Sequence, residues 1–492
     1  MAKYDHKINE NNSVRLSTYY SNDEYSIASD TTNSYGNKIL ALSWKHKFND
    51  KNIGEISLSN SNYFFDIDYE NESNKNFNLK YNIDETNVKL KMKYNHSKKH
   101  KIDYGITSKL YAVLPGEISP TGDISVINPF KIQEEKALES AVFASDNFKV
   151  NNKLSINLGA SYSVFAALGK SSQRIYAENN PKNESTVIGN IDHDNNEVSK
   201  TYKGLSFRFS TRYSLTESTS IKASFNNSYQ FIHRLTNNTS ASPTDTWKLS
   251  DLNIKPQEAT QASLGIYKNI NVNEYEFSVE GYYKEYRNIL DYKIGASLLL
   301  NEHIEADVIQ GVGKSYGIEF LLKKNIGRLN GWVGYSYSRS LLKFKSQFLE
   351  ETINNGKYFP SNFDKPHDVN VVANYKLTKR FSLSANFSYQ TGRPITYPTG
   401  KYILGNTEYL LYSDRNKFRI PDYYRLDLGF NIEGNHKVDK IAHSFWNISI
   451  YNVLGRSNPY SIFFVTEKGS VQGYQNSIFS KPIPTITYNI KF

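Results

Sequence analysis

Pro484-Thr-Ile-Thr-Tyr-Asn-Ile-Lys-Phe492 closes the chain and carries its clearest structural signal. Ile486, Tyr488, Ile490 and Phe492 alternate with polar residues. Successive side chains of a strand point to opposite faces, so this segment has one apolar face and one polar face. The stretch therefore predicts a β-strand that separates two different environments.

The same alternation recurs along most of the chain. It is clear in five segments, which cover residues 154–162, 206–215, 221–229, 381–389 and 424–432. Such segments run for about ten to fifteen residues and often end in Tyr, whereas strands of soluble sheets are usually near five or six residues. That length fits a tilted membrane-spanning strand that ends in an interfacial girdle of aromatic residues. A large soluble sandwich or propeller is the alternative, and the strand length disfavours it.

Composition agrees with a membrane β-barrel. The 492 residues are 14 % aromatic, with 38 Tyr and 27 Phe, and the mean hydropathy is only −0.59. A barrel explains both values because only every second strand residue faces lipid, which would be outer-membrane lipid here. The absence of Cys excludes disulfides, zinc–thiolate sites and thiol nucleophiles. The net charge of +10 is spread mostly singly along the chain, so nucleic acid is not an expected partner.

Short polar turns alternate with connections that are mostly long. The short turns lie near residues 9–12, 49–52, 96–100, 150–152, 216–218, 271–274, 326–329, 378–380 and 434–440. The clearest long connections are 21–37, 111–136, 164–201, 230–258, 343–367 and 392–420. Outer-membrane barrels have short periplasmic turns and long extracellular loops. The pattern predicts an all-β, transmembrane antiparallel barrel of about 19 strands, whose first strand, near residues 2–8, descends toward the periplasm.

Two features of the N-terminal end bear on completeness. Met1 to Ile8 lacks an apolar core and a small-residue cleavage site, so we expect no signal peptide there. Single-chain bacterial barrels have even strand counts, so an odd count that begins with a descending strand predicts that an up, a down and an up strand are missing from the front.

Four stretches in the last third of the chain resemble TonB-dependent outer-membrane receptors of the Bacteroidota type. They are Tyr389-Gln-Thr-Gly-Arg-Pro-Ile-Thr-Tyr-Pro398, Asp414-Arg-Asn416 with Arg419-Ile-Pro-Asp-Tyr-Tyr-Arg-Leu-Asp-Leu428, Trp446-Asn-Ile-Ser-Ile-Tyr-Asn-Val453 with Asn458-Pro-Tyr460, and Pro482-Ile-Pro-Thr-Ile-Thr-Tyr-Asn-Ile-Lys-Phe492. Weaker matches at Tyr35-Gly-Asn37 and Trp44 extend the resemblance over nearly the whole chain.

The resemblance implies a function and a set of partners. Such receptors have 22-stranded barrels with a plug in the lumen, so we expect residues 1–492 to be the barrel portion of one, without the plug domain and the first strands. Receptors of this kind bind a scarce nutrient, such as a siderophore, a cofactor, a glycan or a peptide, at extracellular loops. They import it across the bacterial outer membrane with energy from the TonB complex, some with a surface lipoprotein as partner. This chain would reach TonB only through the missing N-terminal part. The alternatives are a passive porin-like channel and a surface adhesin or non-functional truncated receptor.

No catalytic, cofactor or metal site is expected, and the chain is not predicted to be an enzyme. The acidic loop Asp192-His-Asp-Asn-Asn-Glu197 offers oxygen ligands for calcium but lacks the spacing of a calcium loop, so a solvated loop is favoured. His96 and His100 lie in a Lys-rich turn, where a metal is not expected. Ligand capture is expected in the loops at 111–136, 164–201, 230–258 and 392–420, and the sequence does not identify the substrate-binding residues.

Several residues within the family-like stretches have structural interpretations. Arg393 and Pro394 mark the point where a strand leaves the membrane, because proline cannot continue a paired ladder. Arg425 and Asp427 share the lumen-facing side of a strand, and we expect them to pair structurally with neighbouring strands or a plug, with substrate contact as the disfavoured alternative. Trp446 and Tyr424 are expected to face lipid as girdle or packing residues.

Overall fold

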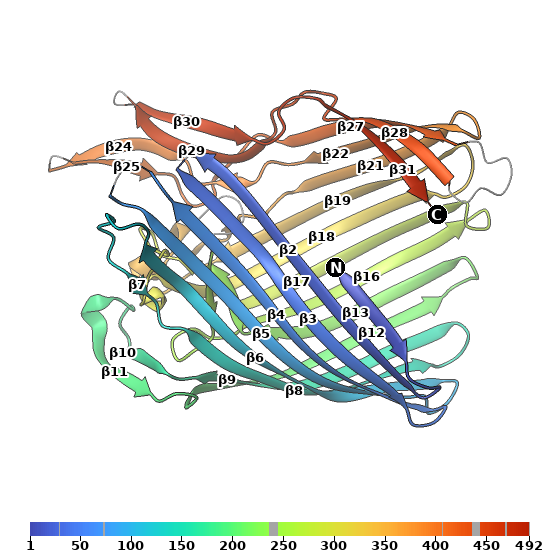
Figure 1. The fold of residues 1–492 in the computed structure, drawn as a ribbon, viewed down its shortest axis with the longest axis horizontal. Helices are drawn as coiled ribbons and strands as arrows, with labels where there is room; N and C mark the ends of the chain where they lie inside the picture. Colours follow the sequence, from blue (N-terminus) through green and yellow to red (C-terminus); the bar gives the residue numbers. More distant parts are fainter. Residues whose placement is uncertain are drawn as a thin grey trace.

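The chain forms one large curled antiparallel sheet with smaller hairpins, seen in a computed structural model that describes residues 1–28, 30–71, 74–235, 245–405, 407–434, 443–467 and 470–491 (Figure 1). The sheet has 21 strands in these residues, of which β7 (Phe130–Lys131) and β20 (Phe359–Pro360) are two-residue pieces. The remaining 19 strands form the wall. The predicted all-β barrel of about 19 strands is therefore confirmed.

The wall strands follow one another around the sheet in chain order. They are β1 (Ala2–Lys7), β2 (Asn12–Ala28), β3 (Thr31–Lys47), β4 (Asn52–Tyr69), β5 (Phe77–Tyr94), β6 (His100–Pro120), β8 (Glu135–Lys149), β9 (Leu154–Leu168), β12 (Val198–Ser214), β13 (Thr219–Gln230), β16 (Gln257–Ile270), β17 (Tyr275–Tyr292), β18 (Val308–Lys324), β19 (Leu329–Lys343), β21 (His367–Lys376), β22 (Phe381–Gln390), β27 (Tyr423–Glu433), β28 (His443–Tyr451) and β31 (Ile483–Lys491).

Alternation along these strands separates two faces of the wall. Val142 in β8 and Leu158 in β9 lie on the outer face and are 53 % and 54 % exposed. Ser161, on the other face of β9, lies opposite Phe143 of β8 and Ser206 of β12. A continuous band of exposed apolar side chains is what a lipid-facing surface requires. In the described residues, no helix is long and apolar enough to cross a membrane.

The two ends of the barrel differ as the sequence predicts. Eight of the predicted short turns lie at one end, on the right in Figure 1, and join neighbouring wall strands. The ninth, at 434–440, lies outside the described residues from residue 435 onward, and so does the terminal Phe492. The other end carries the hairpins β10 (Ser171–Tyr176) with β11 (Val187–His193), β14 (Ile232–Leu235) with β15 (Thr246–Leu249), β24 (Pro398–Leu404) with β25 (Thr407–Tyr412), and β29 (Pro459–Glu467) with β30 (Ser470–Ser477).

The predicted strand lengths are wrong in the first half of the chain. Strand β6 has 21 residues and β4 and β5 have 18 each. Residues 21–28 and 31–37, predicted to belong to a long connection, continue strands β2 and β3, and residues 111–120 continue β6. These strands extend beyond the predicted membrane span because each remains paired with its neighbour. The pairing keeps their backbone N–H and C=O groups hydrogen-bonded outside the membrane as well.

The wall has two sheet edges in the described residues. There, β1 pairs only with β2, and β31 pairs only with β28. Nineteen strands that each run antiparallel to the next place the first and the last in the same direction. The edge strands are thus parallel in direction, as the sequence predicts, and they do not form an antiparallel seam.

Candidate functional site

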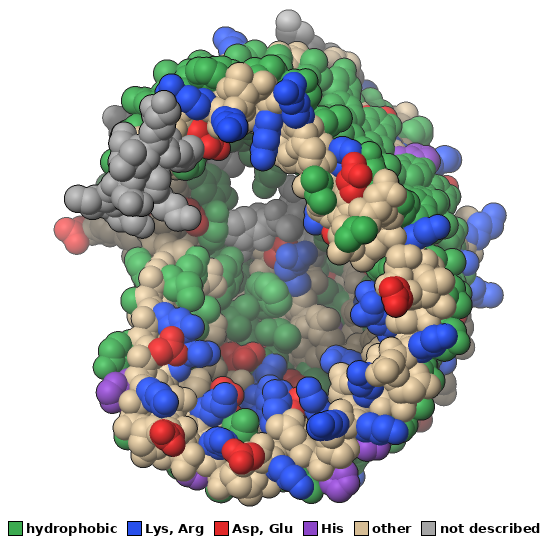
Figure 2. Space-filling model, turned by 90° about the vertical axis from the view of Figure 1, so that its right-hand side faces the viewer, with side chains coloured by type: hydrophobic (Ala, Val, Ile, Leu, Met, Phe, Trp, Pro, Cys, Tyr) green, Lys and Arg blue, Asp and Glu red, His purple; other side chains and the backbone are tan. Residues whose placement is uncertain are grey.

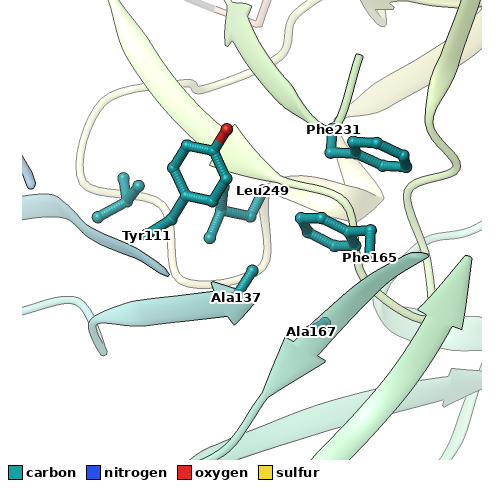
Figure 3. Packing of buried hydrophobic residues seen from close by; sticks show 7 residues of the cluster. Tyr111, Ala137, Phe165, Ala167, Phe231 and Leu249 are labelled. Atoms are coloured by element: carbon teal, nitrogen blue, oxygen red, sulfur yellow. The ribbon is translucent and has the colours of Figure 1, made fainter. Parts of the chain in front are cut away.

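The hairpin β14–β15 lies inside the loop end of the barrel. Phe231 and Leu249 belong to this connection, and they pack against Tyr111, Ala137 and Phe165 of the wall (Figure 3). The rings of Phe165 and Phe231 stack with centroids 4.6 Å apart. Ala137 is paired directly opposite Tyr111, so the two side chains share one face of the wall. Because the hairpin packs against that face, it is the inner one. A connection predicted to be an extracellular loop therefore folds inward and narrows the mouth.

A buried ion cluster anchors this hairpin to the wall. Lys248 Nζ lies 2.6 Å from Glu135 Oε1 and 2.6 Å from Asp251 Oδ2. The second oxygen of Glu135 accepts a 2.8 Å hydrogen bond from the backbone N–H of Leu249. Burial alone would lower the pKa of Lys248, but the carboxylates of Asp251 and Glu135 outweigh it and raise that pKa. Lys248 is therefore a permanent cation that holds two loops together.

Further bonds join four connections into one assembly, which we call the loop layer. Lys182 Nζ donates to the carbonyl of Asn253 at 2.7 Å. Lys293 Nζ donates to the carbonyl of Lys182 at 2.6 Å and pairs with Glu350 Oε1 at 3.2 Å. Residues from the connections at 164–201, 230–258 and 343–367, which the sequence treats as separate loops, thus meet in one structure.

Asp364 is the second centre of the loop layer. Its carboxylate has no exposed side-chain surface and pairs with Arg339 Nε at 3.1 Å and with Arg419. It also accepts a 2.7 Å bond from the backbone N–H of Ser340. Arg419 in β26 (Phe418–Arg419) further donates to the carbonyl of Gly392 at 2.8 Å. Asp364 therefore ties β19 to the connection at 391–422.

The family-like stretch at 414–416 closes the other side of this layer. Arg415 NH1 lies 2.9 Å from Asp291 Oδ1, and its guanidinium lies over the ring of Tyr292 at 4.2 Å. Asn416 is buried and donates to the carbonyl of Pro360 at 2.9 Å. These contacts are structural; the sequence marked Arg415 and Asn416 only as part of a family-like stretch and assigned no role to Asp291 or Tyr292.

The stretch at 389–398 turns tightly where the wall ends. Strand β22 stops at Gln390, and Pro394 begins the short strand β23 (Pro394–Ile395) outside the wall, so the wall strand ends next to the predicted position. A Cβ added to Gly392 would lie 1.7 Å from the carbonyl oxygen of Ile420, so only glycine fits. Arg393 donates to the carbonyl of Tyr460.

Arg425 and Asp427, expected to pair with neighbouring strands or a plug, pair with each other within β27, and Arg425 also reaches the neighbouring strand. Arg425 NH2 lies 3.0 Å from Asp427 Oδ2, and Arg425 NH1 donates to the hydroxyl of Tyr451 in β28 at 2.6 Å. Trp446 is exposed on the outer face, whereas Tyr424 is half-buried beneath the guanidinium of Arg456 at 3.9 Å. All of these contacts are structural.

The acidic loop and the two histidines have local partners. Glu197 Oε2 accepts a 2.7 Å bond from the backbone N–H of Asp194 within the turn. His100 Nδ1 lies 2.6 Å from Asp146 Oδ2, and the hydroxyl of Tyr94 lies 3.0 Å from His96 Nδ1. No group of three or more His, Asp or Glu residues in the described ranges is arranged to hold a metal ion.

Two cavities are lined in part by the β14–β15 hairpin. The first, of about 320 Å³, is lined by charged and polar groups that include Glu134, Lys136 and His303. The second, of about 430 Å³, is lined by Trp247 and Tyr286 together with Arg234, Asp291 and other residues. Aromatic walls with a few polar groups are typical of small-molecule sites. The only sequence signal for this site is a rare Trp in a predicted loop, and the sequence has four Trp in all.

The hairpin contains a buried histidine that predicts a pH response. His233 is 2 % exposed, and its Nε2 lies 2.9 Å from Ser250 Oγ. Burial, with the nearby charge of Lys248, lowers the pKa of His233 from 6.5 to about 4. Below pH 6.5 the open hairpin binds a proton that the packed hairpin excludes, so packing loses stability as the pH falls from 6.5 toward 4.

We expect the opening free energy of the hairpin to fall by roughly 3 kcal/mol between pH 7 and pH 4 because of His233. Amide hydrogen exchange at 232–235 and 246–249, corrected for the intrinsic pH dependence, measures this fall. A His233→Gln variant keeps a hydrogen-bonding side chain without the titration, so its profile should be flatter by that amount. Identical profiles for the two proteins would contradict the prediction.

Comparisons with known proteins agree on the architecture. A family model described as TonB dependent receptor-like, beta-barrel, matches residues 1–453. The ferripyoverdine receptor of the outer membrane of Pseudomonas aeruginosa superposes with a TM-score of 0.63 at 11 % identity, covering 99 % of this chain and 64 % of that one. The ferric-catecholate import receptor Fiu from E. coli K12 gives 0.61 at 12 % identity, covering 99 % and 73 %. The copper transporter OprC gives 0.62 at 11 % identity, covering 99 % and 70 %.

At these identities the likeness to solved structures shows the fold alone. The chain spans less than two thirds of the length of the ferripyoverdine receptor. The search of curated proteins gave no match.

Proposed function

This chain belongs to the TonB dependent receptor-like β-barrel family, and from that premise we propose that it serves in the import of a scarce nutrient across the outer membrane with energy delivered by TonB. The family consists of outer-membrane transport receptors and not of enzymes. The chain is accordingly a β-barrel of the bacterial outer membrane.

The loop layer is the observation that carries this proposal. A passive channel needs a clear path, whereas here the β14–β15 hairpin is pinned inside the mouth through Lys248 and Glu135. Two half-open cavities with polar and aromatic walls also lie against the layer. An inward-folded connection beside half-open cavities supports capture of a specific ligand.

The substrate class and the finer relationships are also proposals. The structural relatives are described as receptors or transporters for ferripyoverdine, ferric catecholate and copper, and we propose a nutrient of comparable scarcity, whether a siderophore, a cofactor, a glycan or a peptide. We further propose that residues 1–492 form one barrel domain of the Bacteroidota type, with outer-membrane lipid around the wall and a surface lipoprotein at the loops. The prediction that this chain lacks a plug and the first strands stays a prediction.

Ion conductance separates import from passive flow. The receptor extracted from outer membranes and placed in a planar lipid bilayer should show a low steady conductance, because the anchored β14–β15 hairpin narrows the mouth. A variant that replaces the hairpin residues 231–249 by a short Gly-Ser linker should conduct more. A conductance of the native protein as large as that of the variant, together with nutrient uptake that persists in cells without TonB, would contradict the proposal. That pair of results would support the porin-like channel.

A further inference from the structure

The Lys-rich turn at 96–100 forms part of a recess at the short-turn end of the barrel. The recess has a volume of about 400 Å³, and its lining includes Lys98, Lys99, Lys101, Lys149, Lys153 and Arg212. Its other lining residues are Asn, Ser and Leu, with no Asp or Glu. Figure 2 looks into this end of the barrel and shows Lys and Arg side chains gathered along the lower rim. We call this site the basic recess.

The six cations of the basic recess have no carboxylate partners within the described part of the chain. The acidic residues next to them along the strands are already engaged. Asp103 pairs with Lys91 at 3.0 Å, and Asp146 pairs with His100 at 2.6 Å. Like charges also meet nearby, because Arg212 is paired directly opposite Lys222 of β13. Such an arrangement is unfavourable by itself and favours an anion between the cations.

Strand register places the basic recess on the lumen side of the wall. Lys101 lies opposite Asn147, and Lys149 and Arg212 both lie opposite Ser155, so these residues share one face. The other face of the same strands carries exposed apolar residues such as Tyr104 and Tyr213. Lys101, Lys149 and Arg212 therefore face the interior of the barrel and not lipid, and Lys98, Lys99 and Lys153 lie in the adjoining turns.

We propose that the basic recess binds a small, multiply charged anion that carries phosphate or carboxylate groups. Its volume lies within the range of small-molecule sites, roughly 300–1,000 Å³. Six cations at one end of the barrel, without a carboxylate partner among the described residues, attract an anion that has passed the loop layer. The recess thus holds the imported nutrient as it leaves the barrel, and this assignment of the nutrient as anionic rests on the proposed function. Anion binding itself does not depend on import.

Calorimetric titration of the full receptor, extracted from outer membranes in a neutral detergent, tests the site. The probes are tripolyphosphate for phosphate groups and citrate for carboxylate groups. We expect at least one probe to bind, with an affinity that falls as salt rises. The variant K101Q/K149Q/R212Q should bind at least tenfold more weakly, whereas K101R/K149R/R212K, which keeps the charges, should bind like the native protein. A heat-modifiable gel shift verifies that each variant is folded.

The matched control removes three exposed cations at the same end, outside the basic recess. The variant K268Q/K376Q/K379Q should bind like the native protein. No binding of either probe, or equal losses in the control and the recess variant, would overturn the proposal. An acidic polypeptide segment that already fills the recess would give the first of these results. Binding without TonB-driven uptake would contradict the proposed function and leave the site standing, while uptake without binding would overturn the site alone.

Discussion

Replacement of Lys248 by Met should release the β14–β15 hairpin from the wall. The change leaves the carboxylates of Glu135 and Asp251 buried side by side, with side chains only 20 % and 13 % exposed and no cation between them. Removal of one partner from a buried ion pair costs about 3–5 kcal/mol. Amide hydrogen exchange at 232–235 and 246–249 should therefore accelerate by more than about a hundredfold, since 1.4 kcal/mol corresponds to a factor of ten.

The matched control for this prediction is Lys131→Met. Lys131 pairs with Glu117 at 3.1 Å, but its side chain is 59 % exposed. Exposed pairs contribute about 0–1 kcal/mol, so exchange in the hairpin should stay as in the native protein. If Lys248→Met left exchange within threefold of the native rate, the ion cluster would not be the anchor of the hairpin.

Replacement of Asp364 by Ala should loosen the other half of the loop layer. Arg339 and Arg419 both lose their carboxylate partner, and the backbone N–H of Ser340 loses its acceptor. The two arginine side chains are 27 % and 29 % exposed, so water partly replaces the lost carboxylate. The cost should therefore lie near the lower end of the range for broken buried pairs, at about 3 kcal/mol.

Exchange of backbone amides at 338–343 and 418–420 measures this loss. Asp364→Asn keeps an acceptor without the charge and should show a smaller acceleration than Asp364→Ala. Asp414→Ala serves as the control, because Asp414 is 61 % exposed and lies 3.8 Å from Lys417 in the same connection. An effect of Asp414→Ala as large as that of Asp364→Ala would show that any substitution destabilises this connection. Asp364 would then not be its anchor.

The wall was predictable because its signals are local. The alternation around Leu158 and Ser161 follows from the geometry of a single strand, and turn composition near 150–152 marks where the strand reverses. Lengths were less predictable. Strands β2 and β3 continue beyond the expected span, because pairing with a neighbour stabilises a strand outside the membrane. The length of a strand thus depends on its neighbour, which the sequence of one segment does not show.

The candidate site was not predictable from local pattern. Lys248 and Glu135 are 113 residues apart in the chain, and Arg419 and Asp364 are 55 apart. The sequence marked several loops for ligand capture, but nothing in it indicated that they fold inward and bond to one another. The stretches that resemble the receptor family are largely structural within the loop layer, as Gly392 and Asn416 show.

By itself, the sequence determined a membrane barrel with one lipid-facing surface, short turns at one end and long connections at the other. Hydrophobic periodicity and turn composition are properties of short segments. The hydrophobic effect and local hydrogen bonding therefore act on them in the same way in any barrel. Only the tertiary structure decided that Lys248 and Asp364 anchor a bonded loop layer, and that five lysines and one arginine from two turns and three strands meet in one basic recess. Those outcomes depend on strand order and register around the whole barrel, which bring distant charges together where water is partly excluded.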